Sequence, residues 1–224
     1  MWEGADVAVA DPSAALALDA DLFDAVEDER GGEALRFWEC PHVAVILGRS
    51  SVVRAEVDEE RCTRDHIPTL RRVSGGGAVV VGPGCLNYSL VLSLDERPEL
   101  RNVPQSYEII LNRIATGLGL AGMNVRGLGD LTLHDRKVSG CAQRRGRRAL
   151  LHHGTFLCDF DLHVMERYLR MPPRAPAYRR GRSHINFVAN LPLSAGTVRA
   201  RLLSSWGPGQ SPGLVRAHGL PGAL

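Results

Sequence analysis

Hydrophobic residues recur at intervals of three or four along several stretches of this chain, the spacing of a helix with one buried face. We expect a first helix over residues 11–30, where Asp11 is placed to cap it and Pro12 suits its first turn. Its predicted inward residues are Ala15, Leu18, Leu22 and Val26. On a second helix, over residues 105–118, they are Tyr107, Ile110, Leu111, Ile114 and Leu118. Shorter helices are expected over residues 57–66, 161–169 and 194–205.

Short apolar runs bounded by turn-forming residues predict β-strands in the rest of the chain. They cover residues 35–39, 43–47, 69–72, 78–81, 86–94, 130–134, 137–143 and 149–159. Asp135 and Arg136 separate two of these runs as the turn of a hairpin. Most strands follow one another without a helix between them, so we expect an α+β fold with a mixed, largely antiparallel sheet flanked by helices. Residues 171–193 are rich in proline and arginine and are expected to be irregular.

The size and composition of the chain restrict its class. Its 224 residues are 44% hydrophobic and 23% charged, so we expect one domain over residues 1–206 and a Gly/Pro-rich tail over residues 207–224. A formal net charge of +2 does not favour a nucleic-acid partner. We find no apolar run long enough to span a bilayer and no leader, so no membrane partner is expected. Five cysteines, an odd number, favour a cytoplasmic location over a disulfide scaffold.

One residue count points to chemistry. The chain has 27 basic residues, and Lys137 is the single lysine among them. A chain that otherwise uses arginine keeps a compact ammonium here, either by accident or because a planar guanidinium cannot replace it. Lys137 is therefore the first candidate for a catalytic side chain.

A glycine loop, Ser74-Gly75-Gly76-Gly77, lies between two predicted strands. Glycines let the backbone approach a phosphate, successive N–H groups can point at its oxygens, and Arg72 is close enough in sequence to neutralise charge. No Gly-Lys-Ser/Thr follows, so the loop is not a P-loop. A strand rather than a helix comes next, which is unlike a dinucleotide-binding turn. Anion binding and a plain flexible loop are both open at this point.

Four motifs occur in an order that resembles the lipoate–protein ligase A family. They are RRVSGGGAV at residues 71–79, Gly-Asp-Leu at 129–131, KVSGCA at 137–142 and His-Gly-Thr at 153–155. The runs ALDADLFDAV, LRFWECPHVAVILGRS and PAYRRGRSHINFVANL also look like that family, so the resemblance covers about residues 14–193. It implies a catalytic domain with the fold of biotin and lipoyl protein ligases, in which a mixed sheet is flanked by helices and the acyl group lies in a tunnel.

The resemblance also implies an enzyme of protein lipoylation. Members of the family activate lipoate or octanoate with ATP and Mg²⁺ as an acyl-adenylate, and then pass the acyl group to a lysine of a lipoyl domain. In this sequence Lys137 would be the catalytic lysine, because an ammonium screens the repulsion between a carboxylate and a phosphate. The nucleotide and the acyl-adenylate would be held by Arg72, Ser74, Gly75, Gly76, Gly77, Ala78, Val79, Val80, Asp130 and Lys137. The acyl group would be bound by Ser139, Gly140, Ala142, His153, Gly154 and Thr155.

Asp130 has three roles open to it. It orients Lys137, contacts Mg²⁺, or caps a strand. No metal site fixed by the protein itself is otherwise expected.

The sequence departs from the family's ligases after the glycine loop. Ligases commonly carry His-Asp-x-Gly-Asn there and octanoyltransferases His-Gly-Pro-Gly-Gln, whereas this chain has Val81-Gly82-Pro83-Gly84-Cys85. The histidine is gone, and a thiol is present. Octanoyltransferases take the acyl group from acyl carrier protein as a cysteine thioester, so a transferase that uses Cys85 is the alternative function, although an inert buried thiol is the commoner state. A non-catalytic binding module of the same fold is a second alternative.

The partners implied by the resemblance are apo lipoyl domains of 2-oxoacid dehydrogenase complexes or the glycine cleavage H protein. Only about 30 residues follow Leu193, so we expect no C-terminal accessory domain. The chain would then be a self-sufficient ligase, need a small accessory subunit, or perform only the transfer step. Two arginine clusters, at residues 144–148 and 170–182, are expected on the surface, where they suit an acidic partner protein.

Overall fold

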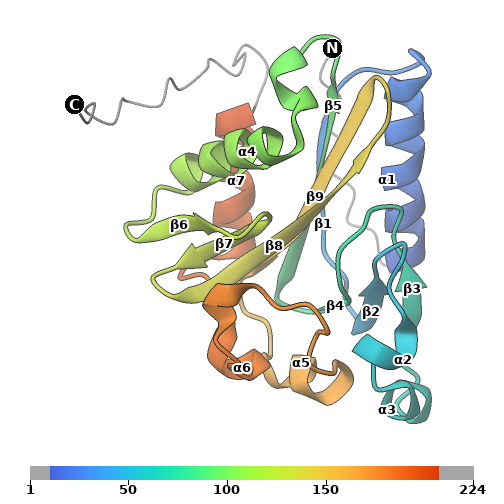
Figure 1. Cartoon of the computed structure of the whole chain (residues 1–224), viewed down its shortest axis with the longest axis vertical. Helices are drawn as coiled ribbons and strands as arrows, with labels where there is room; N and C mark the ends of the chain where they lie inside the picture. The colour runs from blue at the N-terminus through green and yellow to red at the C-terminus, as the bar shows by residue number, and fades with distance from the viewer. Residues whose placement is uncertain (1–10, 207–224) are drawn as a thin grey trace.

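A six-stranded antiparallel sheet forms the centre of the computed structural model, which describes residues 11–206 (Figure 1). In spatial order its strands are β1 (Ala34–Trp38), β5 (Cys85–Ser93), β9 (Ala149–Leu157), β8 (Arg136–Arg145), β7 (Asp130–Leu133) and β6 (Met123–Arg126). The first ten residues of the predicted domain and the predicted tail, residues 207–224, lie outside the described residues.

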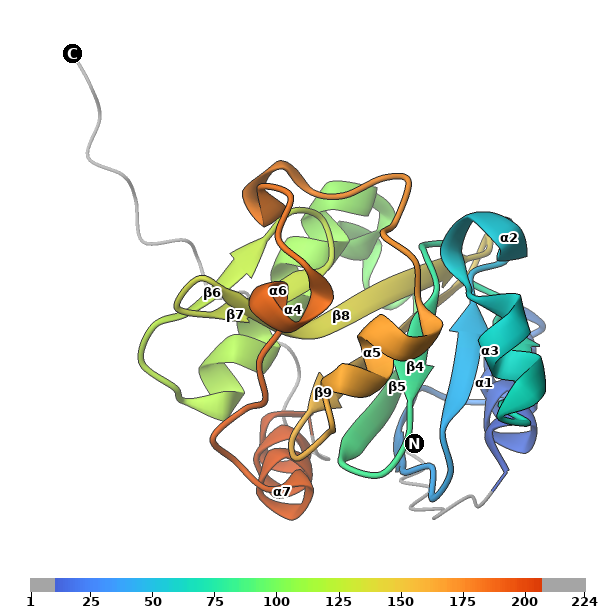
Figure 2. The same ribbon diagram turned by 90° about the horizontal axis from the view of Figure 1, so that it is seen from below.

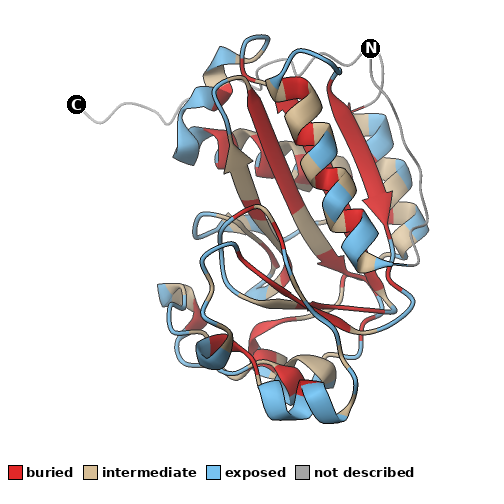
Figure 3. Cartoon of the chain, turned by 90° about the vertical axis from the view of Figure 1, so that its right-hand side faces the viewer, coloured by how far each residue is buried: buried red, intermediate tan, exposed pale blue. Residues whose placement is uncertain are grey.

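Helices cover both faces of this sheet. On one face, α1 (Pro12–Glu27) buries Phe23 and Val26 against Val91 and Leu151. On the other face lie α4 (Val103–Leu118) and α7 (Ala195–Trp206), which share a core with the sheet (Figure 1). β5 is buried along eight consecutive residues because it lies between these two helix layers. Figure 3 shows the buried strands beside α1, whose outward residues are exposed.

A smaller sheet lies beside one end of the large one. Its strand order is β3 (Thr69–Arg71), β2 (Ala44–Leu47) and β4 (Val79–Val81), with β2 parallel to β3 and antiparallel to β4. Short helices gather at this end, as Figure 2 shows: α2 (Val53–Glu56), α3 (Glu59–Arg64), α5 (His163–Tyr168) and α6 (His184–Phe187). The remaining 3₁₀ turns are Pro98–Arg101 and Ala177–Arg179. The expected α+β class, with a mixed and largely antiparallel sheet, is confirmed.

The buried face of α1 differs from the predicted one. The helix buries Ala15, Asp19, Phe23 and Val26, and it leaves Leu18 and Leu22 only half-buried. The stripe is rotated because α1 turns a carboxylate toward the sheet, where Asp19 meets Arg36 of β1. For α4 the predicted inward residues are all buried.

Three other expectations needed correction. The helix predicted over residues 57–66 is the shorter α3, because Val57 is extended and forms a bridge with Leu169, and Asp58 caps α3 by accepting from the backbone of Arg61. The preceding helix α2 was not predicted. β6 was not predicted, since its residues alternate between half-buried and exposed. The segment 171–193, expected to be irregular, contains α6 and a 3₁₀ turn. Within residues 11–206, no helix has both the length and the apolar character needed to cross a membrane.

Candidate active site

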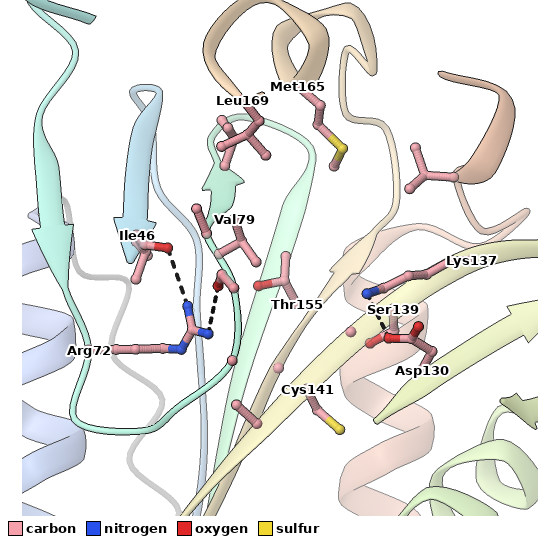
Figure 4. Close-up of a pocket in the computed structure, with 18 of the residues that line it drawn as sticks. Ile46, Arg72, Val79, Asp130, Lys137, Ser139, Cys141, Thr155, Met165 and Leu169 are labelled. Carbon is pink, nitrogen blue, oxygen red and sulfur yellow. Dashed lines mark hydrogen bonds and ion pairs between the residues drawn. The ribbon is translucent and has the colours of Figure 1, made fainter. Parts of the chain in front are cut away.

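A pocket of about 280 Å³ opens between the two sheets. Its walls come from β4 and the glycine loop, from β8 and β9, and from the segment between α5 and α6 (Figure 4). Most of the predicted site residues line it: Arg72, Gly76, Gly77, Ala78, Val79, Val80, Asp130, Lys137, Ser139, Gly140, Ala142, His153, Gly154 and Thr155. Ser74, Gly75 and Cys85 are not among its lining residues. The fold therefore brings the glycine loop and Lys137 to one cavity.

Lys137 extends into this pocket from the start of β8, and its Nζ lies 2.6 Å from Oδ1 of Asp130 (Figure 4). The other carboxylate oxygen accepts a hydrogen bond of 2.6 Å from the hydroxyl of Tyr178. Burial and the nearby Asp130 charge raise the pKa of Tyr178, which keeps its hydroxyl protonated as a donor. The lysine side chain is 27% exposed, so its ammonium is accessible to a ligand in the pocket.

The hairpin of β7 and β8 sets this pairing. Asp130 lies opposite Gly140 in the register, whereas Lys137 lies opposite Thr132, with a register shift between Leu131 and Thr132. The lysine side chain folds back over Gly140 to reach the carboxylate. A Cβ at position 140 would lie 2.5 Å from Nζ, so glycine leaves the space that the ammonium fills.

Arg72 supports the glycine loop from within the fold. Its guanidinium donates hydrogen bonds to the Ser74 hydroxyl and to the carbonyl oxygens of Gly75, Gly77 and Ile46. The residue is buried, and this burial lowers the pKa of Arg72 to about 10. The donors are thus directed at the loop itself, whose conformation they hold.

Glu56 of α2 holds the same loop from the other side. Its Oε2 accepts a hydrogen bond of 2.5 Å from the backbone N–H of Ala78, and Glu56 also lines the pocket. Ser51 donates to the carbonyl oxygen of Gly76. Gly48 packs so closely against the loop that a Cβ there would clash with that same carbonyl. The loop is therefore a supported structure with its backbone at the pocket wall.

His153 joins the loop to a buried charge network. Its Nε2 lies 2.5 Å from Oγ of Ser74, and its Nδ1 lies 3.1 Å from Oδ2 of Asp19. The other oxygen of Asp19 accepts a hydrogen bond of 2.5 Å from Arg36. Burial opposes the charge of Asp19, but the hydrogen bond and charge of His153, together with Arg36, outweigh it and lower the pKa of this carboxyl. A buried ion pair therefore lies beneath the pocket.

Ser139 presents an unpaired hydroxyl beside the lysine. The residue is 2% exposed and lines the pocket, and Figure 4 shows it next to Lys137 and Asp130. Its Oγ has no hydrogen-bond partner in the part of the chain that the structure describes. Because buried polar groups are nearly always paired, this hydroxyl suits a polar ligand atom near the ammonium.

The cysteines do not offer an obvious nucleophile. Cys85 is fully buried with Leu157 and Phe160, and burial raises the pKa of its thiol to about 12. The thiolate is the reactive form, so this environment disfavours a thioester at Cys85. Cys141 does line the pocket, but its Sγ donates to the carbonyl of Gly129, and burial and the Asp130 charge raise its pKa. All five cysteines are free thiols.

Three residues that support the site were not predicted from the sequence: Asp19 and Glu56, which line the pocket, and Tyr178, which holds Asp130 from outside its lining. Asp19 carried a usable signal, since it lies at helical spacing between Ala15 and Phe23 and so shares their face. Glu56 and Tyr178 carried none, because their partners are distant in sequence.

The two arginine clusters have different environments. In the first, Arg144 pairs with Asp24 and Arg148 with Glu29, so this cluster is tied to α1 and the turn after it. In the second, Arg170, Arg174 and Arg179 line the pocket. These three arginines therefore place positive charge along the wall of the cavity formed by the segment between α5 and α6.

The residues present do not form a magnesium site of their own. Both oxygens of Asp130 are engaged, one by Lys137 and one by Tyr178. Residues 11–206 contain no group of three or more His, Cys, Asp and Glu side chains gathered as for a metal ion. Of the three roles left open for Asp130, the geometry favours the one of orienting Lys137, and a Mg²⁺ contact would have to share the carboxylate with these two partners.

The sequence matches the protein family described as lipoyl protein ligase A/B catalytic domain over residues 11–199. It is 34% identical over 133 residues to lipoate-protein ligase A of Blochmanniella floridana, covering 56% of this chain and 36% of that protein. It is 25% identical over 176 residues to octanoyltransferase LipM of Clostridioides difficile, covering 69% of this chain and 65% of that protein. The chain thus spans between about a third and two thirds of the length of the curated relatives it matches.

Among solved structures, a similar one is the bipartite lipoate protein ligase of Thermoplasma acidophilum, described together with its E2 lipoyl domain. The two share 25% sequence identity and superpose with a TM-score of 0.72, over 92% of this chain and 82% of that one.

Proposed function

Since this chain belongs to the lipoyl protein ligase A/B catalytic-domain family, we propose that it activates lipoate or octanoate with ATP and transfers the acyl group to a lysine of a lipoyl domain. The observation that carries the proposal is the position of Lys137. The chain's single lysine places its ammonium in the pocket, against Asp130 and across the cavity from the glycine loop. Residues 1–206 are proposed as the catalytic domain.

In the first step the carboxylate of the acid attacks the α-phosphorus of ATP, an acyl–phosphate bond forms and pyrophosphate leaves. Two anions must approach each other, and the Lys137 ammonium lowers the cost of this approach by lying between them. The unpaired Ser139 hydroxyl is available to donate to a carboxylate oxygen. Asp130 and Tyr178 position the lysine and take no part in bond changes.

In the second step the amine of the acceptor lysine attacks the acyl carbonyl, an amide forms and AMP leaves with the bonding electrons. The amine loses a proton in the process. The same ammonium stabilises the negative charge that develops on the carbonyl oxygen and on the departing phosphate. One fixed cation thus serves both steps.

The nucleotide phosphate is proposed to lie on the backbone of Gly77, Val79 and Val80, with Gly75 and Gly76 completing the loop. Ala78, whose N–H donates to Glu56, holds the loop in place. Arg72 acts through this loop, because its donors hold the loop carbonyls. Ser74 also acts indirectly, through its contact with His153. We assign Mg²⁺ to the nucleotide as its counter-ion, since Asp130 is already engaged by its two partners.

The acyl chain is proposed to follow β8 and β9 along Gly140, Ala142, Gly154 and Thr155 to His153. The acceptor is a lipoyl domain of a 2-oxoacid dehydrogenase complex or the glycine cleavage H protein, in the cytoplasm. The arginines around the pocket suit an acidic acceptor surface. A small accessory subunit that completes adenylation is the alternative to a self-sufficient ligase.

A second candidate is octanoyl transfer from acyl carrier protein. Two observations favour it: the relative named octanoyltransferase, and the Gly82-Pro83-Gly84 turn. The buried position and raised pKa of Cys85 count against a thioester at that residue. A non-catalytic binding module would not require a lysine held over Gly140, and we rank it last.

Intact-mass spectrometry of an apo lipoyl domain tests these functions. Three separate reactions each contain the lipoyl domain, the protein and one acyl donor. The donors are lipoate plus Mg-ATP, preformed lipoyl-adenylate, and octanoyl-acyl carrier protein. Acylation with lipoate and ATP supports the complete ligase. Acylation from the adenylate alone supports transfer with a separate activating partner. Acylation from the carrier protein alone replaces the ligase by the transferase, and no acylation of either type of lipoyl protein contradicts both enzymatic functions.

A further inference from the structure

The acyl-transfer step needs a proton acceptor, because the attacking amine cannot become an amide while it keeps all of its protons. As its lone pair enters the new N–C bond, the nitrogen becomes positively charged and its N–H becomes acidic. A side chain that accepts this proton must line the pocket and be unprotonated, with a free lone pair. Most basic side chains of the described pocket wall are already engaged: Asp19 by Arg36 and His153, Glu56 by the Ala78 N–H, Asp130 by Lys137 and Tyr178, and His153 by Ser74 and Asp19.

His184, the first residue of α6, has such a lone pair. It lines the pocket and is 9% exposed. Its Nε2 lies 3.2 Å from the carbonyl oxygen of Arg170, and a carbonyl only accepts, so Nε2 carries the ring proton. This is the single hydrogen bond of the imidazole within residues 11–206. In the neutral ring, the lone pair of Nδ1 is therefore free for a ligand in the pocket.

The chain after α6 brings His184 close to the catalytic lysine. Val188 forms a β-bridge with Lys137, and the N–H of Ala189 donates a hydrogen bond of 2.8 Å to the Lys137 carbonyl. The Val188 N–H in turn donates a hydrogen bond of 2.9 Å to the His184 carbonyl. The imidazole thus lies on the part of the pocket wall that adjoins Lys137, where the acyl carbonyl is proposed to bind.

The surroundings of His184 keep its ring neutral. Burial, and then the charges of Arg179 and Lys137, lower the pKa of His184 below its ordinary value of 6.5. The Arg170 carbonyl and the charge of Glu166 act in the opposite direction without reversing the shift. The ring is consequently unprotonated at neutral pH, the state in which Nδ1 accepts a proton.

We propose that His184 is the general base of acyl transfer, and that its Nδ1 takes the proton that the acceptor amine loses as it attacks the acyl carbonyl. The proposal rests on the transfer step proposed above. The amine enters in its neutral form after giving one proton to solvent. The N–C bond then forms, the N–H bond breaks and its proton goes to Nδ1. The C–O bond to the phosphate breaks, AMP leaves with the electron pair, and the imidazolium returns its proton to solvent.

His184→Gln tests this role, since a glutamine amide can donate to the Arg170 carbonyl but has no basic nitrogen. We expect the rate of transfer from preformed lipoyl-adenylate to an apo lipoyl domain to fall about 10²-fold, the lower end of the range for a general base. Calorimetric titration with a non-hydrolysable adenylate analogue is expected to give an affinity within about threefold of the wild type. His163→Gln in α5 is the matched control, because His163 is exposed and is not a lining residue of the pocket.

The pH dependence of the transfer rate separates a base from a structural residue. Above the pKa of His184 only the acceptor amine titrates, so the logarithm of the wild-type rate rises by about one per pH unit. Below that pKa, which lies under 6.5, His184 titrates as well and the slope approaches about two. His184→Gln is expected to keep a slope of about one throughout. In His184→Ala, added imidazole is expected to restore part of the rate.

Three outcomes would overturn the inference and leave the proposed function standing. They are a His184→Gln rate within about threefold of the wild type, parallel pH profiles, and a loss of analogue binding as large as the loss of rate. The last would show that His184 only supports the shape of the pocket. Failure of the wild-type protein to transfer from lipoyl-adenylate would instead remove the proposed function, and this inference with it.

Discussion

At the scale of single residues, the site depends on the side chain of Lys137 and on the absence of a side chain at Gly140. Lys137 supplies the charge, and Gly140 supplies the space in which that charge lies against Asp130. Neither is replaceable by a chemically similar residue. Arginine has the charge but a planar, larger group, and alanine at position 140 has the backbone but fills the space.

Replacing Lys137 separates charge from shape. We expect Lys137→Ala to lower the rate of acyl transfer from lipoyl-adenylate by about 10²–10³-fold, the effect of losing one preorganised donor. Lys137→Arg is expected to lose nearly as much, because a guanidinium cannot occupy the same point. Quenched-flow mass spectrometry of the lipoyl domain gives the rate. Full activity in the arginine variant would show that charge alone suffices.

Gly140→Ala tests the space beside the lysine. The new Cβ would lie 2.5 Å from Nζ and 2.7 Å from Cε, so the ammonium must move. A displacement of this kind is expected to reduce the transfer rate by about 10²-fold. Gly196→Ala in α7 is the matched control, since its Cβ would meet only the Ser194 hydroxyl at 4.0 Å. Equal rates in the two variants would contradict the assigned lysine position.

At the scale of elements, the glycine loop is held by the end of β3, by α2 and by β9. Arg72 binds its carbonyl oxygens, Glu56 accepts from Ala78, and His153 contacts Ser74. The loop therefore resembles a preorganised wall more than a flexible linker, and its support comes from three separate elements.

Substitutions at Glu56 test this support. Glu56→Gln keeps an oxygen that accepts from Ala78, whereas Glu56→Ala removes it. We expect the alanine variant to bind lipoyl-adenylate about tenfold more weakly, in line with the loss of one charge-assisted hydrogen bond, and the glutamine variant to remain within about threefold of the wild type. Calorimetric titration with a non-hydrolysable adenylate analogue measures both. Equal losses in the two variants would show that the carboxylate charge matters instead.

The elements with strong periodicity were predictable from the sequence. α4 buries the predicted face because its apolar spacing is unambiguous, and the strands around Lys137 were placed to within a few residues. The helix predicted over residues 57–66 exists as α3 but begins two residues later, because Val57 pairs with Leu169, a contact made in the folded protein by residues far apart in sequence. Local spacing has no information about such a bridge.

The site was predictable in its chemistry but less so in its geometry. The lone lysine and the glycine loop were visible as residue types, and the structure places both at one pocket. The direct partners of Arg72 were not predictable, because they are carbonyl oxygens that become acceptors only when the loop folds. Tyr178 lies in a proline-rich segment, and its contact with Asp130 has no signal in local sequence.

At the scale of the whole molecule, the pocket is a junction of two cores. The larger core lies between the six-stranded sheet and helices α4 and α7, and the smaller one joins the three-stranded sheet to α5 and α6. The ion pair of Asp19 and Arg36 lies under the junction, at most 1% exposed. Global stability and the shape of the pocket are therefore coupled through this pair.

Asp19→Asn leaves the Arg36 charge buried without its counter-charge. We expect the free energy of unfolding at pH 7 to fall by about 3–5 kcal/mol, measured by urea denaturation. The double variant Asp19→Leu/Arg36→Met replaces both charges by apolar groups and is expected to recover most of this loss. A double variant as unstable as the single variant would show that the unpaired Arg36 charge does not cause the loss of stability.

The same carboxyl predicts a response to acid. In the folded protein its pKa lies below the ordinary value of 3.8, so the folded state binds fewer protons than the unfolded chain. Its stabilisation is complete above about pH 4 and is lost as the pH falls through the lower, folded-state pKa. Denaturation curves between pH 7 and pH 2 should show this decline, and Asp19→Asn should have a shallower one. Parallel curves would assign the acid response to other carboxyls.

Because Lys137 is the single lysine, the reaction of this protein with amine-selective reagents is simple to interpret. An acyl-adenylate is a mixed anhydride of a carboxylic acid and a phosphate, and it acylates exposed amines without a catalyst. A chain rich in lysine would therefore be acylated on its own surface. Here every other basic side chain is arginine, whose guanidinium stays protonated and unreactive. Apart from the α-amine, Lys137 is therefore the one amine that an amine-selective reagent can modify. The extent of labelling at Lys137 reports directly whether a ligand occupies the pocket.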